Sequence, residues 1–222
     1  MLKYLKLFNL RWRALTMSIL PVSWRFSRIY KQHWWGGVGS ESASGRGSSL
    51  EATDKVRRGL PDLLKQLECN KMLDLGCGDF NWMRHVDLDV AYLGGDVVPD
   101  VIRENQARYS NERVNFIVLD GIRDPIPDDV DVILCREVLF HLSFRHALAL
   151  LKNIYRSNAK FLIATQIDTG IPNVDVHTGG FRPIDLTCAP FDFPAPLRCI
   201  PDDAISENRS LAVWRVADFP LR

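Results

Sequence analysis

Between residues 71 and 167, short apolar segments alternate with stretches of helical periodicity, and each apolar segment ends near a polar residue or a glycine. Such alternation favours a parallel sheet covered by helices on both faces. We therefore expect an α/β fold with a doubly wound, mostly parallel sheet. The expected strands cover residues 71–76, 91–96, 114–120, 130–137, 160–166 and, near the C-terminus, 210–216; the expected helices include 50–67, 99–109 and 145–156.

A glycine turn follows the first expected strand, in the sequence LDLGCGDFNWM. Gly76 and Gly78 let the backbone bend tightly and let a ligand approach the main chain, and a helix is expected to start at Asp79 or Phe80. A dinucleotide site would need a third glycine, and a Walker loop would need a lysine followed by serine or threonine. Asp79 would also repel a phosphate. The turn therefore indicates a ligand that is not held through phosphate.

Acidic residues end the next two expected strands. Asp96 lies twenty-two residues after Asp74 and is well placed to accept hydrogen bonds from ribose hydroxyls, or else to cap the helix that begins at Pro99. Asp120 can receive an adenine amino proton, or it starts a turn. Two acids beside a glycine turn suit a nucleoside that carries positive charge and no phosphate, and S-adenosylmethionine is such a molecule.

The segments LDLGCGDF, GGDVVPDVI, VLDGIRDPIP and VDVILCREVLFHLS, in this order over residues 70–165, resemble the class I S-adenosylmethionine-dependent methyltransferases. The resemblance implies a Rossmann-like sheet of about seven strands with an antiparallel last strand. It also implies S-adenosylmethionine as cofactor, held by Asp74, Gly76, Cys77, Gly78, Asp96, Asp120, Gly121 and Cys135. Arg136 and Glu137 would lie beneath the reacting methyl. No Asn/Asp-Pro-Pro-Tyr/Phe stretch follows the fourth strand, which argues against methylation of base amines or glutamine amides.

The catalytic and acceptor-binding residues are less determined by the sequence. The candidates for a general base are His141, Glu137 and Asp168; the alternative for His141 is a structural role in its helical segment. The candidates for acceptor binding are Asn81, Trp82, Asn173, His177 and Arg182. Those after residue 166 lie in a segment rich in proline and glycine, where they meet the acceptor or satisfy turns. Tryptophans 34, 35 and 82 wall the pocket or fill the core. We find no metal site in the sequence.

The first 40 residues contain seven lysines and arginines and no acid. Residues 1–49 are expected to form a basic helical extension that ends in a Gly/Ser-rich lid over 36–49. Residues 1–30 either lie on an anionic membrane surface or pack on the protein's own core. Residues 50–222 would form the methyltransferase domain, with a substrate-side insertion at about 167–209.

The composition restricts the partners and the compartment. A net charge of +1 makes no case for nucleic acid, and five widely spaced cysteines without a CxxC pair indicate free thiols in a reducing compartment. We expect a cytoplasmic enzyme, free or peripheral at the inner face of the membrane. The function expected first is O-methylation of a glycan or other small polar acceptor. The alternatives are N-methylation of a protein or small molecule, and a non-catalytic module for cofactor binding or assembly.

Overall fold

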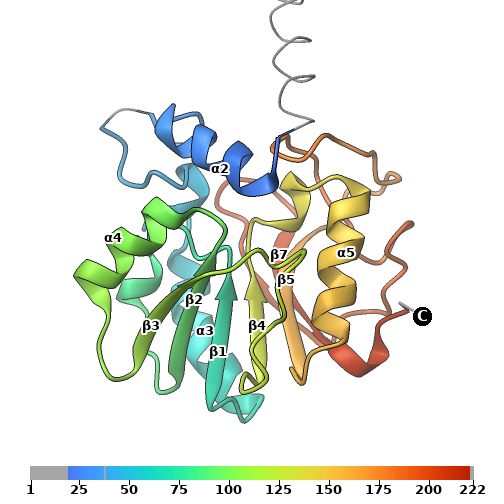
Figure 1. Ribbon diagram of the computed structural model, residues 1–222. Helices are drawn as coiled ribbons and strands as arrows, with labels where there is room; N and C mark the ends of the chain where they lie inside the picture. Colours follow the sequence, from blue (N-terminus) through green and yellow to red (C-terminus); the bar gives the residue numbers. More distant parts are fainter. Residues whose placement is uncertain (1–19, 38, 221–222) are drawn as a thin grey trace, which may run out of the picture.

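Seven strands form one sheet in the order β3-β2-β1-β4-β5-β7-β6 in the computed structural model, which describes residues 20–37 and 39–220 (Figure 1). Strands β1 to β5 pair in parallel, and β7 pairs antiparallel with both β5 and β6. The expected sheet with an antiparallel last strand is confirmed. The strands are β1 (Lys71–Leu75), β2 (Ala91–Asp96), β3 (Val114–Val118), β4 (Val132–Cys135), β5 (Phe161–Ile167), β6 (Arg198–Pro201) and β7 (Arg209–Arg215).

Both faces of the sheet are covered, because successive residues of each buried strand point to opposite faces. In β4, Ile133 belongs to the same apolar cluster as Leu151 of α5 (Phe144–Tyr155). Its neighbour Leu134 belongs to a second cluster, which contains Leu60 of α3 (Asp54–Gln66). Helix α4 (Pro99–Tyr109) joins this second cluster through Ile102. The sheet is therefore doubly wound, as expected, and α3 runs unbroken through Pro61.

Helix α2 (Val22–Lys31) lies beyond the carboxyl ends of the parallel strands, above their arrowheads in Figure 1. Its residues Val22, Phe26 and Ile29 are buried in the same cluster as α5. Burial of each such side chain stabilises the fold by about 1.5–3 kcal/mol relative to exposure. The N-terminal segment therefore packs on the domain from residue 20 onward and covers this edge of the sheet.

Residues 1–19 lie outside the described residues, so the expected membrane contact of residues 1–30 and the cytoplasmic location stay predictions. In the part of the chain that the structure describes, no helix combines the length and the apolar character that crossing a bilayer requires.

The connection after β1 differs from the expected helix. A turn leads instead into one short 3-10 helix, Met83–His85. Phe80 adopts a positive φ of 58°, which an α-helix does not allow, and its ring contacts those of Tyr92 and Phe116 with centroids 5.0 Å apart in each case. Asp79 accepts a hydrogen bond from the amide of Asn81, two residues on. Local side-chain bonding of this kind competes with helix formation.

The segment 167–209, expected as an irregular insertion, contains strand β6. This strand pairs only with β7 and forms the edge of the sheet. It ends in Pro201, and proline is tolerated at a sheet edge because one side of the strand needs no partner. Four residues flanked by prolines give little strand pattern, which explains why the sequence did not predict it.

Candidate active site

One cavity lies at the carboxyl ends of β1, β2 and β4, between this edge of the sheet and α2. At the edge of the sheet the cavity is lined by Asp74, Gly76, Cys77, Gly78, Asp96, Asp120, Gly121, Arg136, Glu137 and Val138. The segment from α2 to residue 48 contributes Val22, Phe26, Tyr30, Trp35, Ser44 and Ser48. Parallel sheets bind ligands at this edge. The structure thus gathers most of the sequence-predicted cofactor residues around a single cavity.

The glycine turn has the geometry that the sequence predicted. Gly76 and Gly78 have positive φ angles of 83° and 57°, which favour glycine. The amides of Gly76 and Cys77 both donate to the carbonyl of Gly95 on β2, at 2.7 and 3.1 Å. A Cβ atom on Gly76 would lie 2.4 Å from the side chain of Val138. The turn therefore packs closely against β2 and Val138, and a side chain at Gly76 would force Val138 to move.

Asp96 holds the turn from the second strand. One of its carboxylate oxygens accepts a hydrogen bond from the amide of Gly78 at 3.1 Å, and the other from the amide of Val98 at 2.9 Å. Burial raises the pKa of Asp96 to about 6. The two hydrogen bonds favour the charged form and lower the pKa, but the effect of burial is larger. A carboxylate offers about four acceptor positions, so capacity remains for ligand hydroxyls.

Asp74 is a second buried acid in the same cavity. The hydroxyl of Tyr92 donates to it at 2.8 Å. Burial, and to a smaller extent the nearby Asp96, raises the pKa of Asp74 to about 7. Two carboxyl groups that resist ionisation in a shared cavity favour a ligand that brings positive charge.

Asp120 starts a turn, one of the two roles that the sequence left open, and it also lines the cavity, so adenine recognition stays a prediction. Its carboxylate accepts from the amide of Ile122 at 3.1 Å, while its own amide donates to Asp124 at 2.8 Å. Gly121, the next residue, also lines the cavity, and a Cβ atom there would lie 3.0 Å from Leu75.

His141 also lines the cavity and lies in a 3-10 helix (Leu139–His141). Its Nδ1 lies 2.6 Å from the carbonyl oxygen of Gly180. Because a carbonyl only accepts, Nδ1 carries the proton, and Nε2 carries the lone pair in the neutral ring. Nε2 makes no hydrogen bond with any residue that the structure describes, and His141 is among the residues that line the cavity. Burial lowers the pKa of His141, which keeps the ring neutral.

Trp35 and Trp82 supply aromatic surface to the cavity. The Trp35 ring stacks on the His141 imidazole, with centroids 4.7 Å apart and planes 23° apart. The guanidinium of Arg136 lies 5.3 Å above the Trp82 ring. These contacts orient His141 and Arg136 beside the cavity.

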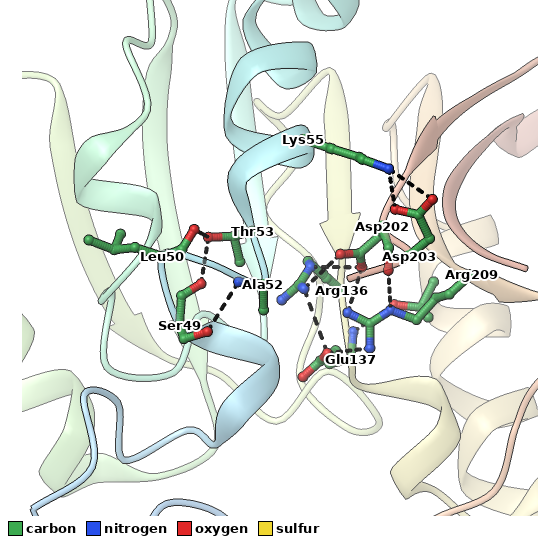
Figure 2. Close-up of polar contacts among 11 residues, drawn as sticks. Ser49, Leu50, Ala52, Thr53, Lys55, Arg136, Glu137, Asp202, Asp203 and Arg209 are labelled. Atoms are coloured by element: carbon green, nitrogen blue, oxygen red, sulfur yellow. Dashed lines mark hydrogen bonds and ion pairs between the residues drawn. The ribbon is translucent and has the colours of Figure 1, made fainter. Parts of the chain in front are cut away.

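A buried network of two arginines and two acids borders the cavity (Figure 2). Arg136 and Glu137 follow β4, Asp202 follows β6, and Arg209 begins β7. Arg136 donates to Asp202 from two nitrogens, at 3.1 and 2.9 Å. Arg209 lies 2.7 Å from Glu137 and 3.0 Å from Asp202. Asp202 and Arg209 were missed by sequence reasoning, because nothing local to 202 or 209 reveals a partner 66 or more residues away.

The Gly/Ser-rich segment is bound to the turn after β1 through Asp79. The Asp79 carboxylate accepts hydrogen bonds from the hydroxyls of Ser42 and Ser44 and from the amide of Ala43, at 2.7 to 3.1 Å. Asn81, expected to bind the acceptor, instead donates to Glu41 and to the carbonyl of Ser48. Asp79 and Asn81 thus hold this segment over the cavity.

Several predicted residues lie away from the cavity. Cys135 is fully buried within the sheet, and burial raises the pKa of its thiol. The side-chain amide of Asn173 donates to the backbone carbonyls of Asp185, Cys188 and Ala189 and accepts from the amide of Asp185. The remaining three, Asp168, His177 and Arg182, also lie outside the cavity lining.

Arg182 makes its contacts with groups of the protein itself. It is 3% exposed, and its guanidinium donates to the carbonyl of Leu142 at 2.5 Å and lies 4.7 Å above the Phe144 ring. It fixes the insertion against the 3-10 helix of His141. Within residues 20–37 and 39–220, no three His, Cys, Asp or Glu side chains are grouped as a metal site requires.

The fold and cavity are those of an α/β domain with a cavity at the carboxyl ends of its parallel strands and without a phosphate-binding glycine motif. Residues 72–160 match the methyltransferase domain family, over less than half of the 222 residues. A comparison with curated protein sequences gives no match.

Two solved structures share the fold, and one of them is a methyltransferase. The human N-acetylserotonin methyltransferase, solved in complex with S-adenosylmethionine, is 16% identical with a TM-score of 0.60, covering 88% of this chain and 60% of that chain. TnmH is 17% identical with a TM-score of 0.58, covering 77% and 55%. This chain thus spans 55–60% of the length of these two structures. These two structures show a shared fold, and the family match covers residues 72–160 within it; both agree with the resemblance that the sequence showed.

Proposed function

We propose that this protein transfers a methyl group from S-adenosylmethionine to an oxygen atom of a glycan or other small polar acceptor. The observation that carries the proposal is one cavity lined by two buried acids, a glycine turn and an imidazole that burial keeps neutral. The proposal would be supported by transfer of labelled methyl from S-adenosylmethionine into a fraction of cell extract. Label in protein would favour the N-methylation alternative.

The residues of the glycine turn and the strand ends fit this molecule. Gly76 and Gly78 would lie against its methionine portion, Asp96 would accept from the ribose hydroxyls, and Asp120 would lie beside the adenine. Asp74 adds negative charge where a positively charged group is bound. When bound, S-adenosylmethionine supplies an electrophilic methyl group on a sulfonium, and the protein must align an acceptor oxygen opposite the departing sulfur.

His141 is the general base of the proposed reaction. An alcohol is a weak nucleophile, and it must lose its proton as the new C–O bond forms. The Nε2 atom of His141 accepts that proton, because Nδ1 already donates to Gly180. Stacking on Trp35 and the bond to Gly180 fix the ring, so Nε2 needs no rearrangement to act.

The segment 36–49 is proposed to act as a lid, since Ser44 and Ser48 line the cavity from above. We expect Asp79→Ala to accelerate tryptic cleavage after Arg46 about tenfold or more. The carboxylate is the shared acceptor of several bonds, and hydrogen bonds to a charged group are worth about 1.5–3 kcal/mol each. The matched control is Asp87→Ala, which removes an exposed acid nearby. Equal cleavage of both variants would contradict the lid.

The raised pKa values of Asp74 and Asp96 predict a pH dependence of cofactor preference. Both acids ionise between about pH 5 and 8 in the unliganded cavity, and only their charged forms attract a sulfonium. The affinity for S-adenosylmethionine, relative to S-adenosylhomocysteine, which lacks the positive charge, should rise severalfold from pH 5.5 to 8. Calorimetry with both ligands measures this ratio. In the Asp74→Asn variant this affinity ratio should rise less with pH. A wild-type ratio that does not change with pH would contradict the prediction.

The same pKa shifts set the direction of the stability change without ligand. Because the folded state holds these protons more tightly than the unfolded state does, the free energy of unfolding should fall as pH rises from about 4 through 7. Each group contributes at most about 1.4 kcal/mol per pH unit over that range.

A further inference from the structure

The arginine and acid network leaves two unused hydrogen-bonding atoms at the cavity. Both arginines approach the same Glu137 oxygen, Oε1, with Arg209 at 2.7 Å and Arg136 at 3.6 Å. The other oxygen, Oε2, makes no hydrogen bond or ion pair with any residue between 20 and 220 that the structure describes, and the Glu137 side chain is 17% exposed and lines the cavity. Nη1 of Arg136, whose Nε and Nη2 are bound to Asp202, likewise makes no bond within the described residues, and Arg136 also lines the cavity.

These two atoms form an acceptor and donor pair without net charge. Arg136 and Arg209 balance Glu137 and Asp202, so the network as a whole is neutral. Because the network is buried, removing one charged side chain would leave its partner unpaired and would destabilise the fold. An anionic ligand would meet the carboxylate of Glu137, and a cationic ligand would meet the guanidinium of Arg136. A neutral molecule with neighbouring hydroxyl groups can donate to one and accept from the other.

The surroundings restrict the ligand further. The Trp82 ring lies under Arg136, and His141 lines the same cavity. On the lid, a Cβ atom at Gly47 would lie 2.0 and 2.2 Å from the two Glu137 carboxylate oxygens. The lid therefore comes within contact of Glu137, and a ligand on Oε2 would be covered by it.

We infer that Glu137 and Arg136 bind the acceptor through a pair of neighbouring hydroxyl groups, and that Arg209 and Asp202 position these two side chains. The acceptor class is a neutral, polyhydroxylated molecule. This inference rests on the proposed methyl transfer and deepens it. Arg209 and Asp202 are positioning residues outside the segment that matches the methyltransferase family.

The test uses S-adenosylmethionine with a labelled methyl group and cell extract separated by ion exchange into neutral, anionic and cationic fractions. Wild-type protein is expected to label the neutral fraction. Glu137→Gln and Arg209→Lys are expected to raise the amount of that fraction needed for half-maximal labelling about tenfold. The labelling rate at saturation should change much less.

The control is Asp203→Asn, since Asp203 is the exposed neighbour of Asp202 and pairs with Lys55 (Figure 2). It should leave labelling unchanged, and all variants should bind S-adenosylhomocysteine within about twofold of wild type. A merely structural role would lower the melting temperature and the S-adenosylhomocysteine affinity together.

Three outcomes would overturn the inference: label in a charged fraction, half-maximal amounts for Glu137→Gln and Arg209→Lys equal to those of Asp203→Asn, or no label in any fraction while S-adenosylhomocysteine binds. If wild-type protein bound no S-adenosylhomocysteine, the proposed function itself would fail, and this inference with it.

Discussion

Replacing His141 with glutamine is expected to lower the rate of methyl transfer about 10²–10⁴-fold, the usual contribution of a general base. Nε2 of His141 is the basic nitrogen of a ring that lines the cavity and whose burial favours the neutral form. Glutamine offers no comparable base. The measurement is the initial rate of labelled methyl transfer into the extract fraction that wild-type protein labels, together with calorimetry of S-adenosylhomocysteine, whose affinity should change less than about threefold.

The matched control is His146→Gln. His146 is a half-buried histidine five residues away, and its Nδ1 bonds to Thr178 outside the cavity. This variant should transfer methyl groups at nearly the wild-type rate. The pH profile adds a second criterion: the wild-type rate should fall on the acid side at a pH below 6.5, since the pKa of His141 is lowered. Equal rates for both variants would show that His141 is structural.

Asp202→Asn is expected to destabilise the protein by about 3–5 kcal/mol, because it leaves two buried arginines without their shared partner. The Asp202 side chain is fully buried and pairs with arginines that are 3% and 5% exposed. For a chain of this length, the melting temperature should drop by about 10 °C. Thermal unfolding followed by circular dichroism measures the change.

Asp203→Asn provides the comparison, since the adjacent acid makes an exposed ion pair with Lys55. Exposed pairs contribute about 0–1 kcal/mol, so its melting temperature should change by only a few degrees. If Asp202→Asn melted within two or three degrees of Asp203→Asn, the network would not have the importance that we assign to it.

The sequence predicted the sheet and most of the residues that line the cavity at the carboxyl ends of its strands, because both depend on local patterns. Strand ends, positive-φ glycines and the acids that follow them lie within a few residues of each other, as in Leu75, Gly76 and Gly78. Sheet topology then brings Asp96 and Asp120 to the same edge. No partner outside these segments is needed to place them.

The surroundings of the predicted acceptor-binding residues could not be predicted in this way, because their contacts join distant segments. Asp79 follows the glycine turn directly in the sequence, yet it binds the Gly/Ser-rich segment some 35 residues earlier. Asn173 and Arg182 are polar residues of a loop, a pattern typical of binding, yet their hydrogen bonds hold the loop itself. A polar side chain in an irregular segment either satisfies the backbone or meets a ligand, and only the fold distinguishes these roles.

Calorimetric titration with S-adenosylhomocysteine tests the central claim most directly. Wild-type protein should release or absorb measurable heat with a stoichiometry of one. Asp96→Asn, which keeps the shape of the side chain but removes one charged acceptor, should bind about tenfold or more weakly. Absence of binding by a folded wild-type protein, or equal affinity for the wild type and Asp96→Asn, would contradict the assignment of this cavity to the cofactor.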